Sequence, residues 1–193
     1  MIAGTATETE RRVLGRLKPD PVPAIHPVPE HAARGALAEV YARTRQGLGV
    51  PWMGVVAMAL AHYPRFYDRL WSALAPLAAT QAFARACDTL RAGAELEAAA
   101  LSPPDRVPYL ANLGYGDREI EEIRACHEVF SAGNMPYLLM ATIARLLLEG
   151  HDWAGRESLA PRHAAPESMP KPTLIEPHHA DPTIAALYAD IRA

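Results

Sequence analysis

The chain has 193 residues, of which 50% are hydrophobic and 21% are charged, and its formal net charge is −3. This balance is typical of one globular domain with a proper core, and the lack of a basic surplus argues against nucleic acid and anionic membrane surfaces as partners. The chain has only two cysteines, and charged residues occupy the N-terminal region where an exported protein would need an apolar segment. We therefore expect a cytoplasmic protein with no disulfide framework and no membrane span.

The first 46 residues predict an arm followed by a helix. Residues 1–30 hold closely spaced prolines, which remove backbone donors and favour an extended arm. A helix is expected at about 31–46, because Leu37, Val40 and Tyr41 are spaced as on one helical face. This stripe is the part of the helix that should face the core.

Two further helical regions are predicted between residues 53 and 101. The segment 53–61 has no polar side chain and predicts a short helix buried on all sides. Pro64 then opens a longer helical region that reaches about residue 101, and we expect it to bend at Pro76.

The second half of the chain predicts a helix, a break and a second helix. Asp117 is expected to cap an amphipathic helix, which Gly133-Asn134 should end. Pro136 occupies the first-turn position that proline favours, so it should open the next helix. Residues 137–148 are almost wholly apolar, but they are too few to cross a bilayer and predict a buried core helix.

The sequence predicts an all-α protein, because no alternating apolar and polar run of the kind that forms strands is present. We expect a helical repeat domain at 31–150, a connector at 151–173, and the first helix of an incomplete second repeat at 174–193. The evidence for the repeat is a similarity between the start and the end of the chain. Four residues of one helix recur in kind 147 positions later, as Ile184, Leu187, Tyr188 and Arg192 after Leu37, Val40, Tyr41 and Arg45. Ile25 and Pro27 recur at a spacing of 150, as Ile175 and Pro177.

The two most apolar helices each begin beside an unusual cluster, at Trp52 and at Asn134 to Tyr137. Helix N-termini expose unpaired N–H groups, so two converging ends could hold a carboxylate or a halide. A buried Asn134 amide could also hold a water molecule by hydrogen bonds. The alternative is that Asn134 only caps a helix and that Trp52 only packs.

Other reactive residues do not form a convincing site. Cys126 and His127 are adjacent on a helix and do not face each other, so the thiol lacks a base. The histidines of the C-terminal region lack the spacing that puts two imidazoles on one helical face, so we expect no metal ion. They lie in or near the Pro-rich connector: His151, His163, His178 and His179.

Several motifs, in order and spacing, resemble the first repeat of the group I DL-2-haloacid dehalogenases. The resemblance covers about residues 23–150 and continues weakly into 174–193. The motifs that carry it are Glu39-Val40-Tyr41, Gly49-Val50-Pro51-Trp52, Tyr115-Gly116-Asp117-Arg118-Glu119-Ile120-Glu121 and Gly133-Asn134-Met135-Pro136-Tyr137-Leu138-Leu139.

This resemblance implies an all-helical hydrolase with two pseudo-symmetric tandem repeats, an active site between them, and no cofactor. Such enzymes hydrolyse both enantiomers of small 2-halocarboxylic acids. An aspartate-activated water attacks Cα and inverts it, without a covalent intermediate. By resemblance, Asn134 is the catalytic residue that helps to position this water, while Trp52 and Tyr137 bind the substrate.

The chain departs from the family at the catalytic aspartate, which in the family belongs to the second repeat. The second copy here stops at Ala193, before the matching loop, so we expect little or no activity from these 193 residues alone. If the chain supplied a base itself, the candidates would be Asp68, Asp105 and Asp117.

Two alternatives to a dehalogenase stay open. One is a non-catalytic helical module for oligomerisation or for carboxylate binding. The other is a related peroxidatic or decarboxylating enzyme, which the absence of a Cys-x-x-Cys motif disfavours. We also expect a homo-oligomer, such as a dimer, because a single repeat would expose the apolar surface that its partner repeat covers.

Overall fold

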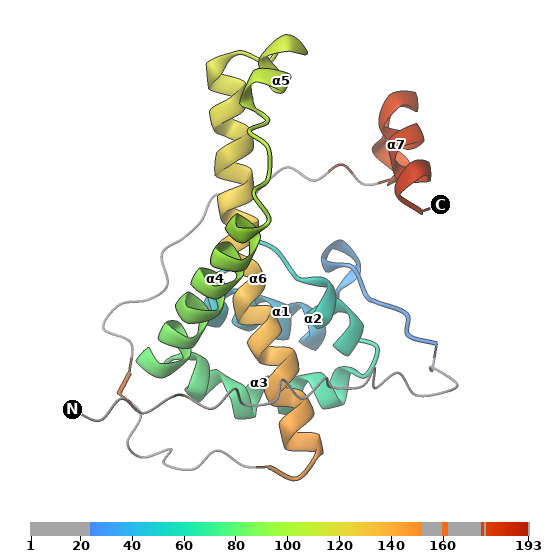
Figure 1. The fold of residues 1–193 in the computed structure, drawn as a ribbon. Helices are drawn as coiled ribbons and strands as arrows, with labels where there is room; N and C mark the ends of the chain where they lie inside the picture. The colour runs from blue at the N-terminus through green and yellow to red at the C-terminus, as the bar shows by residue number, and fades with distance from the viewer. Residues whose placement is uncertain (1–23, 152–159, 162–174, 176, 193) are drawn as a thin grey trace, which may run out of the picture.

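The computed structural model describes residues 24–151, 160–161, 175 and 177–192, and within these residues it contains α-helices and no β-strand (Figure 1). The predicted all-α class is therefore confirmed. No helix in the described part of the chain is long and apolar enough to cross a membrane. In chain order the helices are α1 (Ala36–Leu48), α2 (Val55–Leu60), α3 (Pro64–Ala78), α4 (Gln81–Ala100), α5 (Val107–Asn112), α6 (Asp117–Leu148) and α7 (Pro182–Arg192), with short 3-10 turns η1 (Glu30–Ala32) and η3 (Pro177–His179).

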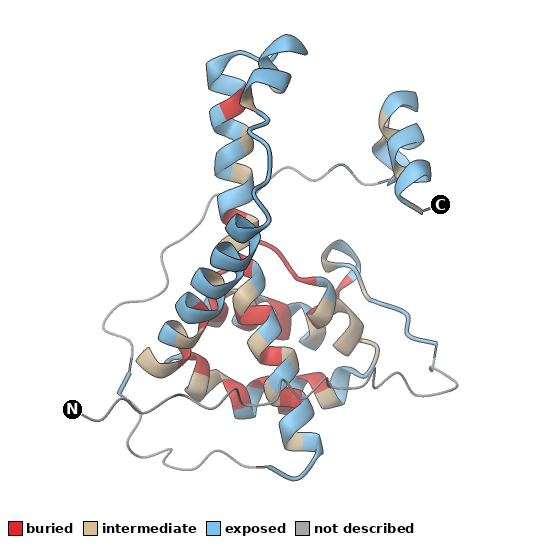
Figure 2. Cartoon of the chain, in the orientation of Figure 1, coloured by how far each residue is buried: buried red, intermediate tan, exposed pale blue. Residues whose placement is uncertain are grey.

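The core lies where α1, α2 and α3 pack beneath the C-terminal half of α6, and Figure 2 shows the buried residues concentrated there. The predicted apolar stripe of α1 faces this core, with Val40 and Tyr41 buried. Thr44 on the same stripe is also buried, and it satisfies its hydroxyl by bonding the Val40 carbonyl and the Tyr67 hydroxyl. The helical spacing in the sequence thus predicted the packing face of α1 correctly.

The expectation that 53–61 forms a helix buried on all sides was wrong. Only Ala57 is buried in α2, and the Val55 side chain is 70% exposed. The segment 53–61 predicts an interior helix because it contains no polar side chain that would mark an exposed face. In the structure, α2 lies at the surface and covers the core with one face.

The long helical region after Pro64 divides at Thr80 and not at Pro76, which lies inside α3. Thr80 is the N-cap of α4: its hydroxyl accepts a hydrogen bond from the Phe83 N–H and donates one to the Leu77 carbonyl. A threonine that satisfies groups of both helices is a strong boundary, because each helix end leaves backbone groups unpaired.

The predicted break at Gly133-Asn134 does not exist, because α6 runs without interruption from Asp117 to Leu148. Pro136 lies inside this helix, although an interior proline normally costs about 3 kcal/mol. Close packing offsets that cost, since Tyr137 and Met140 are both buried in the core. Gly133 and Pro136 are therefore buried residues within one helix, and they do not mark a boundary between two helices.

The N-terminal half of α6 pairs with α4, and the two extend beyond the core as a hairpin closed by α5 (Figure 1). Arg91 on α4 joins the two helices, because its guanidinium pairs with Glu128 on α6 at 2.7 Å and with Glu95 at 2.8 Å. The hairpin carries few buried residues, and the Arg91–Glu128 pair is partly exposed, so this ion pair adds little to its stability.

The similarity between the start and end of the chain extends to hydrogen bonds. The Tyr41 hydroxyl donates to the Val28 carbonyl at 2.6 Å, and the Tyr188 hydroxyl donates to the Ile175 carbonyl at the same distance. Both bonds span 13 residues. The single spacing of 147 also relates η1 to η3.

This register corrects one detail of the predicted repeat. Ile175 corresponds to Val28, and Pro177 corresponds to Glu30. The spacing of 150 that matched Ile25 and Pro27 with Ile175 and Pro177 was therefore wrong. Most of the predicted connector at 151–173, including His163, lies outside the described residues.

Candidate active site

The loop between α1 and α2 interlocks with α6 through two glycines. A Cβ atom at Gly133 would overlap the indole of Trp52, and a Cβ atom at Gly54 would lie 2.7 Å from the Tyr137 ring. Each element thus presents one aromatic ring to a glycine of the other element. Because a glycine lacks a side chain, the two backbones approach closely here.

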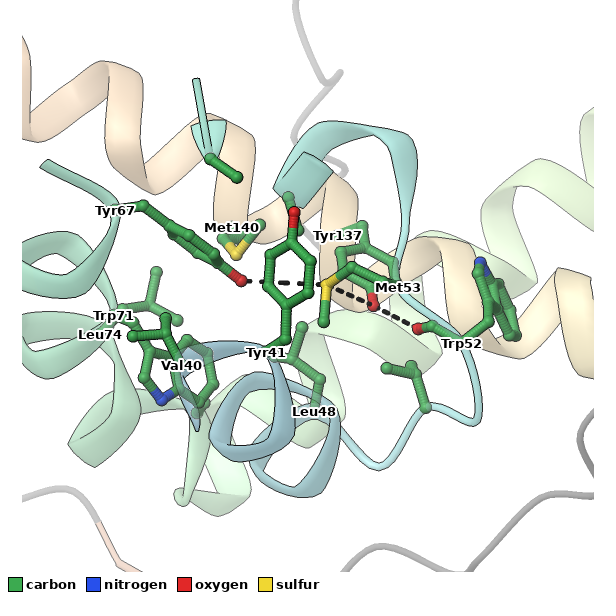
Figure 3. Packing of buried hydrophobic residues seen from close by; sticks show 14 of the residues in the cluster. Val40, Tyr41, Leu48, Trp52, Met53, Tyr67, Trp71, Leu74, Tyr137 and Met140 are labelled. Carbon is green, nitrogen blue, oxygen red and sulfur yellow. Dashed lines mark hydrogen bonds between the residues drawn. The ribbon is translucent and has the colours of Figure 1, made fainter. Parts of the chain in front are cut away.

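A direct hydrogen bond reinforces the interlock. The Tyr137 hydroxyl donates to the Trp52 carbonyl at 2.6 Å, and the hydroxyls of Tyr137 and Tyr67 each lie 3.9 Å from Met53 Sδ (Figure 3). The Phe130 ring meets the edge of the Trp52 indole at a centroid distance of 4.9 Å. The Trp52–Met53 segment is therefore fixed by α3 and α6 together.

Glu30 contacts this loop from the opposite side, and the sequence analysis did not single it out. Its Oε2 accepts a hydrogen bond from the Met53 N–H at 3.3 Å, and its Oε1 pairs with Arg45 at 2.8 Å. Glu30 follows Pro29 in a proline-rich segment, where no helical periodicity marks a functional position. The importance of Glu30 for this loop becomes visible only in its hydrogen bond with Met53, which lies 23 positions later.

The tyrosines around Met53 remain neutral donors over the ordinary pH range. Burial raises the pKa of Tyr137 and of Tyr67 well above the usual value of 10. Burial also raises the pKa of Tyr41 to about 12, and the nearby Glu30 carboxylate adds to this shift. Burial disfavours the phenolate because the charged form loses its hydration.

The structure brings Trp52 and Tyr137 together, while Asn134 follows Gly133 in the sequence of α6 and lies on the exposed side of that helix. Trp52 and Tyr137 are buried, whereas Asn134 is exposed. The idea of a buried Asn134 amide was therefore wrong. The predicted convergence of two helix N-termini was also wrong, because Asn134 lies in the middle of α6 and no helix begins there.

The described residues also contain an apolar cavity of about 550 Å³ between α2, the start of α3 and the end of α6. Its wall includes Val56, Tyr63 and Ala144, with the Arg145–Glu149 ion pair at its rim. None of Trp52, Asn134 and Tyr137 lines it. In the part of the chain that the structure describes, no three His, Cys, Asp or Glu side chains gather in a way that would hold a metal ion.

No protein-family model matches the chain. It is 46% identical over 186 residues to an (R)-2-haloacid dehalogenase of Rhizobium sp. (strain NHG3), a match that covers 93% of this chain and 71% of the relative. It is 38% identical over 174 residues to an (R)-2-haloacid dehalogenase of Pseudomonas putida, covering 87% of this chain and 58% of that one. Further relatives are named configuration-inverting 2-haloacid dehalogenases.

Among solved structures, the chain resembles a mutant D-2-haloacid dehalogenase in complex with D-2-CPA, with a TM-score of 0.78 and 36% sequence identity. The match covers 88% of this chain and 60% of that one. The chain thus spans between about half and seven tenths of the proteins described above.

Proposed function

Because this chain belongs to the 2-haloacid dehalogenase family, we propose that it provides the first repeat of an enzyme that hydrolyses small (R)-2-halocarboxylic acids. Water attacks Cα, the carbon–halogen bond breaks, and the products are the inverted 2-hydroxy acid, a halide ion and a proton. The 46% identity to the Rhizobium (R)-2-haloacid dehalogenase over 93% of this chain is the observation that carries the proposal. The same relative favours the (R) enantiomer over the activity on both enantiomers that the sequence motifs implied.

In this proposal Asn134 is the residue that positions the attacking water. Its exposure supports the role, because an amide on the surface of α6 is open to a water and to a facing group. Trp52, whose indole packs against Gly133, the residue before Asn134, contacts the substrate. Tyr137 acts mainly through Trp52, because its hydroxyl already donates to the Trp52 carbonyl.

The general base comes from a second repeat that faces Asn134. Glu30 is the carboxylate that contacts the Trp52–Met53 loop, but both of its oxygens are engaged, one by Met53 and one by Arg45. The tyrosine–carbonyl bond that recurs after 147 residues supports a tandem repeat. We propose further that the enzyme works in the cytoplasm without a cofactor and forms a homo-oligomer.

The test separates binding from turnover. The 193-residue chain is mixed with (R)- and (S)-2-chloropropionate, and we measure both halide release and the NMR signal of the Asn134 side-chain amide. We expect the (R) enantiomer to shift the Asn134 signal more strongly, with little halide release. Fusion of the chain to the part of the Rhizobium relative that follows the matched region should restore halide release and give the inverted product. No shift at Asn134 with either enantiomer would contradict the site, and a fusion that binds without turnover would favour a non-catalytic module.

A further inference from the structure

We infer that Glu30 is a positioning residue, which holds the Trp52–Met53 peptide in one orientation so that the Trp52 indole stays against Gly133 beside Asn134. The link to catalysis rests on the proposed role of Trp52 in substrate binding. The link between Glu30 and the orientation of Trp52 rests on contacts alone.

The first observation is that one peptide group is bonded at both of its polar atoms. The carbonyl of Trp52 accepts from Tyr137 on α6, and the N–H of Met53 donates to Glu30 Oε2. These two atoms belong to the same planar unit and point in opposite directions. A peptide held at one atom can rotate about that bond, whereas a peptide held at both atoms cannot.

The second observation concerns the other oxygen of Glu30. Oε1 pairs with Arg45 at 2.8 Å, and the two side chains are only 29% and 34% exposed, respectively. Arg45 Nε is buried without a hydrogen-bond partner, so this guanidinium depends on Glu30 for its orientation. The Arg45 carbonyl also accepts from the N–H groups of Gly49 and Val50, where the loop begins. Those two bonds are backbone bonds at the C-terminal end of α1. Glu30 therefore links the end of α1, through the Arg45 guanidinium, to the middle of the loop.

The third observation is that the repeat does not preserve this carboxylate. The tyrosine–carbonyl bond recurs after 147 residues, and an arginine stands at both Arg45 and Arg192. Pro177, however, stands where the register would place the counterpart of Glu30. The C-terminal segment thus forms its 3-10 turn and its tyrosine–carbonyl bond without a glutamate at this position. We conclude that Glu30 is needed to hold the Trp52 loop and is not needed to form the turn and helix themselves.

Removal of Glu30 should release the peptide. Met53 is only 4% exposed, so its N–H would lose its partner in a place that water hardly reaches. An unpaired buried donor is unfavourable, and the peptide would turn about the remaining Tyr137 bond. Because Trp52 belongs to the peptide that turns, its indole would move out of contact with Gly133.

The experiment labels the full chain with 5-fluorotryptophan and follows the ¹⁹F resonances of Trp52, Trp71 and Trp153, with amide exchange measured at Met53. In Glu30→Ala we expect the Trp52 resonance to move, Trp71 to stay, and Met53 exchange to accelerate by about tenfold or more. Glu30→Gln keeps one acceptor oxygen for two donors, so it should give an intermediate result. The matched control is Glu128→Ala, which breaks the Arg91–Glu128 ion pair between α4 and α6 without touching the loop.

The affinity for (R)-2-chloropropionate is measured on the same variants. We expect the dissociation constant to rise by about tenfold in Glu30→Ala, by a smaller factor in Glu30→Gln, and not in Glu128→Ala. An unmoved Trp52 resonance in folded Glu30→Ala, or a similar movement in Glu128→Ala, would overturn the inference. If Glu30→Ala does not fold, an unmoved Trp52 resonance in Glu30→Gln overturns it equally. A moved Trp52 resonance with unchanged affinity would support the role of Glu30 in holding the Trp52–Met53 peptide. It would count against the proposed role of Trp52 in substrate binding.

Discussion

The hydroxyl of Tyr137 donates a 2.6 Å hydrogen bond to the carbonyl of Trp52, which lies 85 residues earlier in the chain. The bond is buried, and it joins the loop after α1 to the middle of α6. It also explains why a tyrosine, and not a phenylalanine, stands at 137: a buried carbonyl needs a donor, and the phenol supplies it.

Tyr137→Phe removes this donor and leaves the buried Trp52 carbonyl unpaired. We expect the free energy of unfolding to fall by about 1–3 kcal/mol, measured by urea denaturation. Tyr63→Phe is the control, because the Tyr63 side chain is 51% exposed and its change should stay within about 0.5 kcal/mol. Equal effects of the two variants would contradict a structural role for the 2.6 Å bond.

Gly133→Ala and Gly93→Ala form a second matched pair, because both glycines lie inside long helices. A Cβ atom at Gly133 would overlap Trp52, whereas nothing lies within 4 Å of a Cβ atom at Gly93. We expect Gly133→Ala to destabilise the protein by about 1–3 kcal/mol, despite the better helix propensity of alanine. Gly93→Ala should stabilise it by about 0.5–1 kcal/mol. Thermal unfolding measures the stability change of both variants. A stabilised Gly133→Ala variant would show that the Trp52 indole does not pack against Gly133.

The buried tyrosines predict a loss of stability in alkali. Burial raises the pKa of Tyr41 to about 12 and raises the pKa of Tyr67 and Tyr137 as well. In the unfolded chain these phenols ionise near pH 10, so above that pH the unfolded state gives up protons that the folded state keeps. Their stabilising contribution is complete below about pH 10 and is lost as the pH rises through the folded pKa values.

Each tyrosine that stays protonated lowers the free energy of unfolding by about 1.4 kcal/mol per pH unit in that window. Tyrosinate absorbance should therefore show that Tyr41, Tyr67 and Tyr137 ionise only with unfolding. Ionisation of all seven tyrosines near pH 10 in the folded protein would contradict the burial of this cluster.

Asn134→Ala tests the proposed water-positioning residue without disturbing the fold. The side chain is exposed in the middle of α6, and alanine favours helix, so the stability should be equal or slightly higher. In a fusion that releases halide, we expect a fall in kcat of about 10²–10⁴-fold. A fusion with unchanged kcat after this substitution would remove Asn134 from the mechanism.

We also predict that the chain self-associates. Exposed leucines on α6 indicate which surface forms the contact between copies. The side chains of Leu138 and Leu148 are 50% and 72% exposed, and large exposed apolar patches usually mark interfaces. Light scattering should show a dimer or higher oligomer at micromolar concentration, and Leu148→Glu should shift it toward monomer. Leu113→Glu, directly after α5 at the closed end of the hairpin, should leave the equilibrium unchanged. A monomer at every concentration would refute the prediction.

Helical periodicity predicted the packing of α1 from sequence, because Val40 and Tyr41 needed only local spacing to reveal their common face. Periodicity could not reveal that Gly133 and Pro136 lie inside one helix. Glycine and proline usually interrupt helices, and the compensating contact with Trp52 comes from a distant loop. Glu30 was missed for the same reason, since its partners lie 15 and 23 residues away and no local pattern marks it.

The continuity of α6 has a consequence for how a substrate would reach Asn134. A helix of 32 residues is a stiff rod about 48 Å long, and this one is braced on one side by Trp52 and along its other end by α4. Trp52 and α4 thus support α6 on either side of Asn134. For the proposed site at Asn134, we expect ligand entry and exit to depend on movement of the surface that faces α6, and mutations that change access to map to that surface.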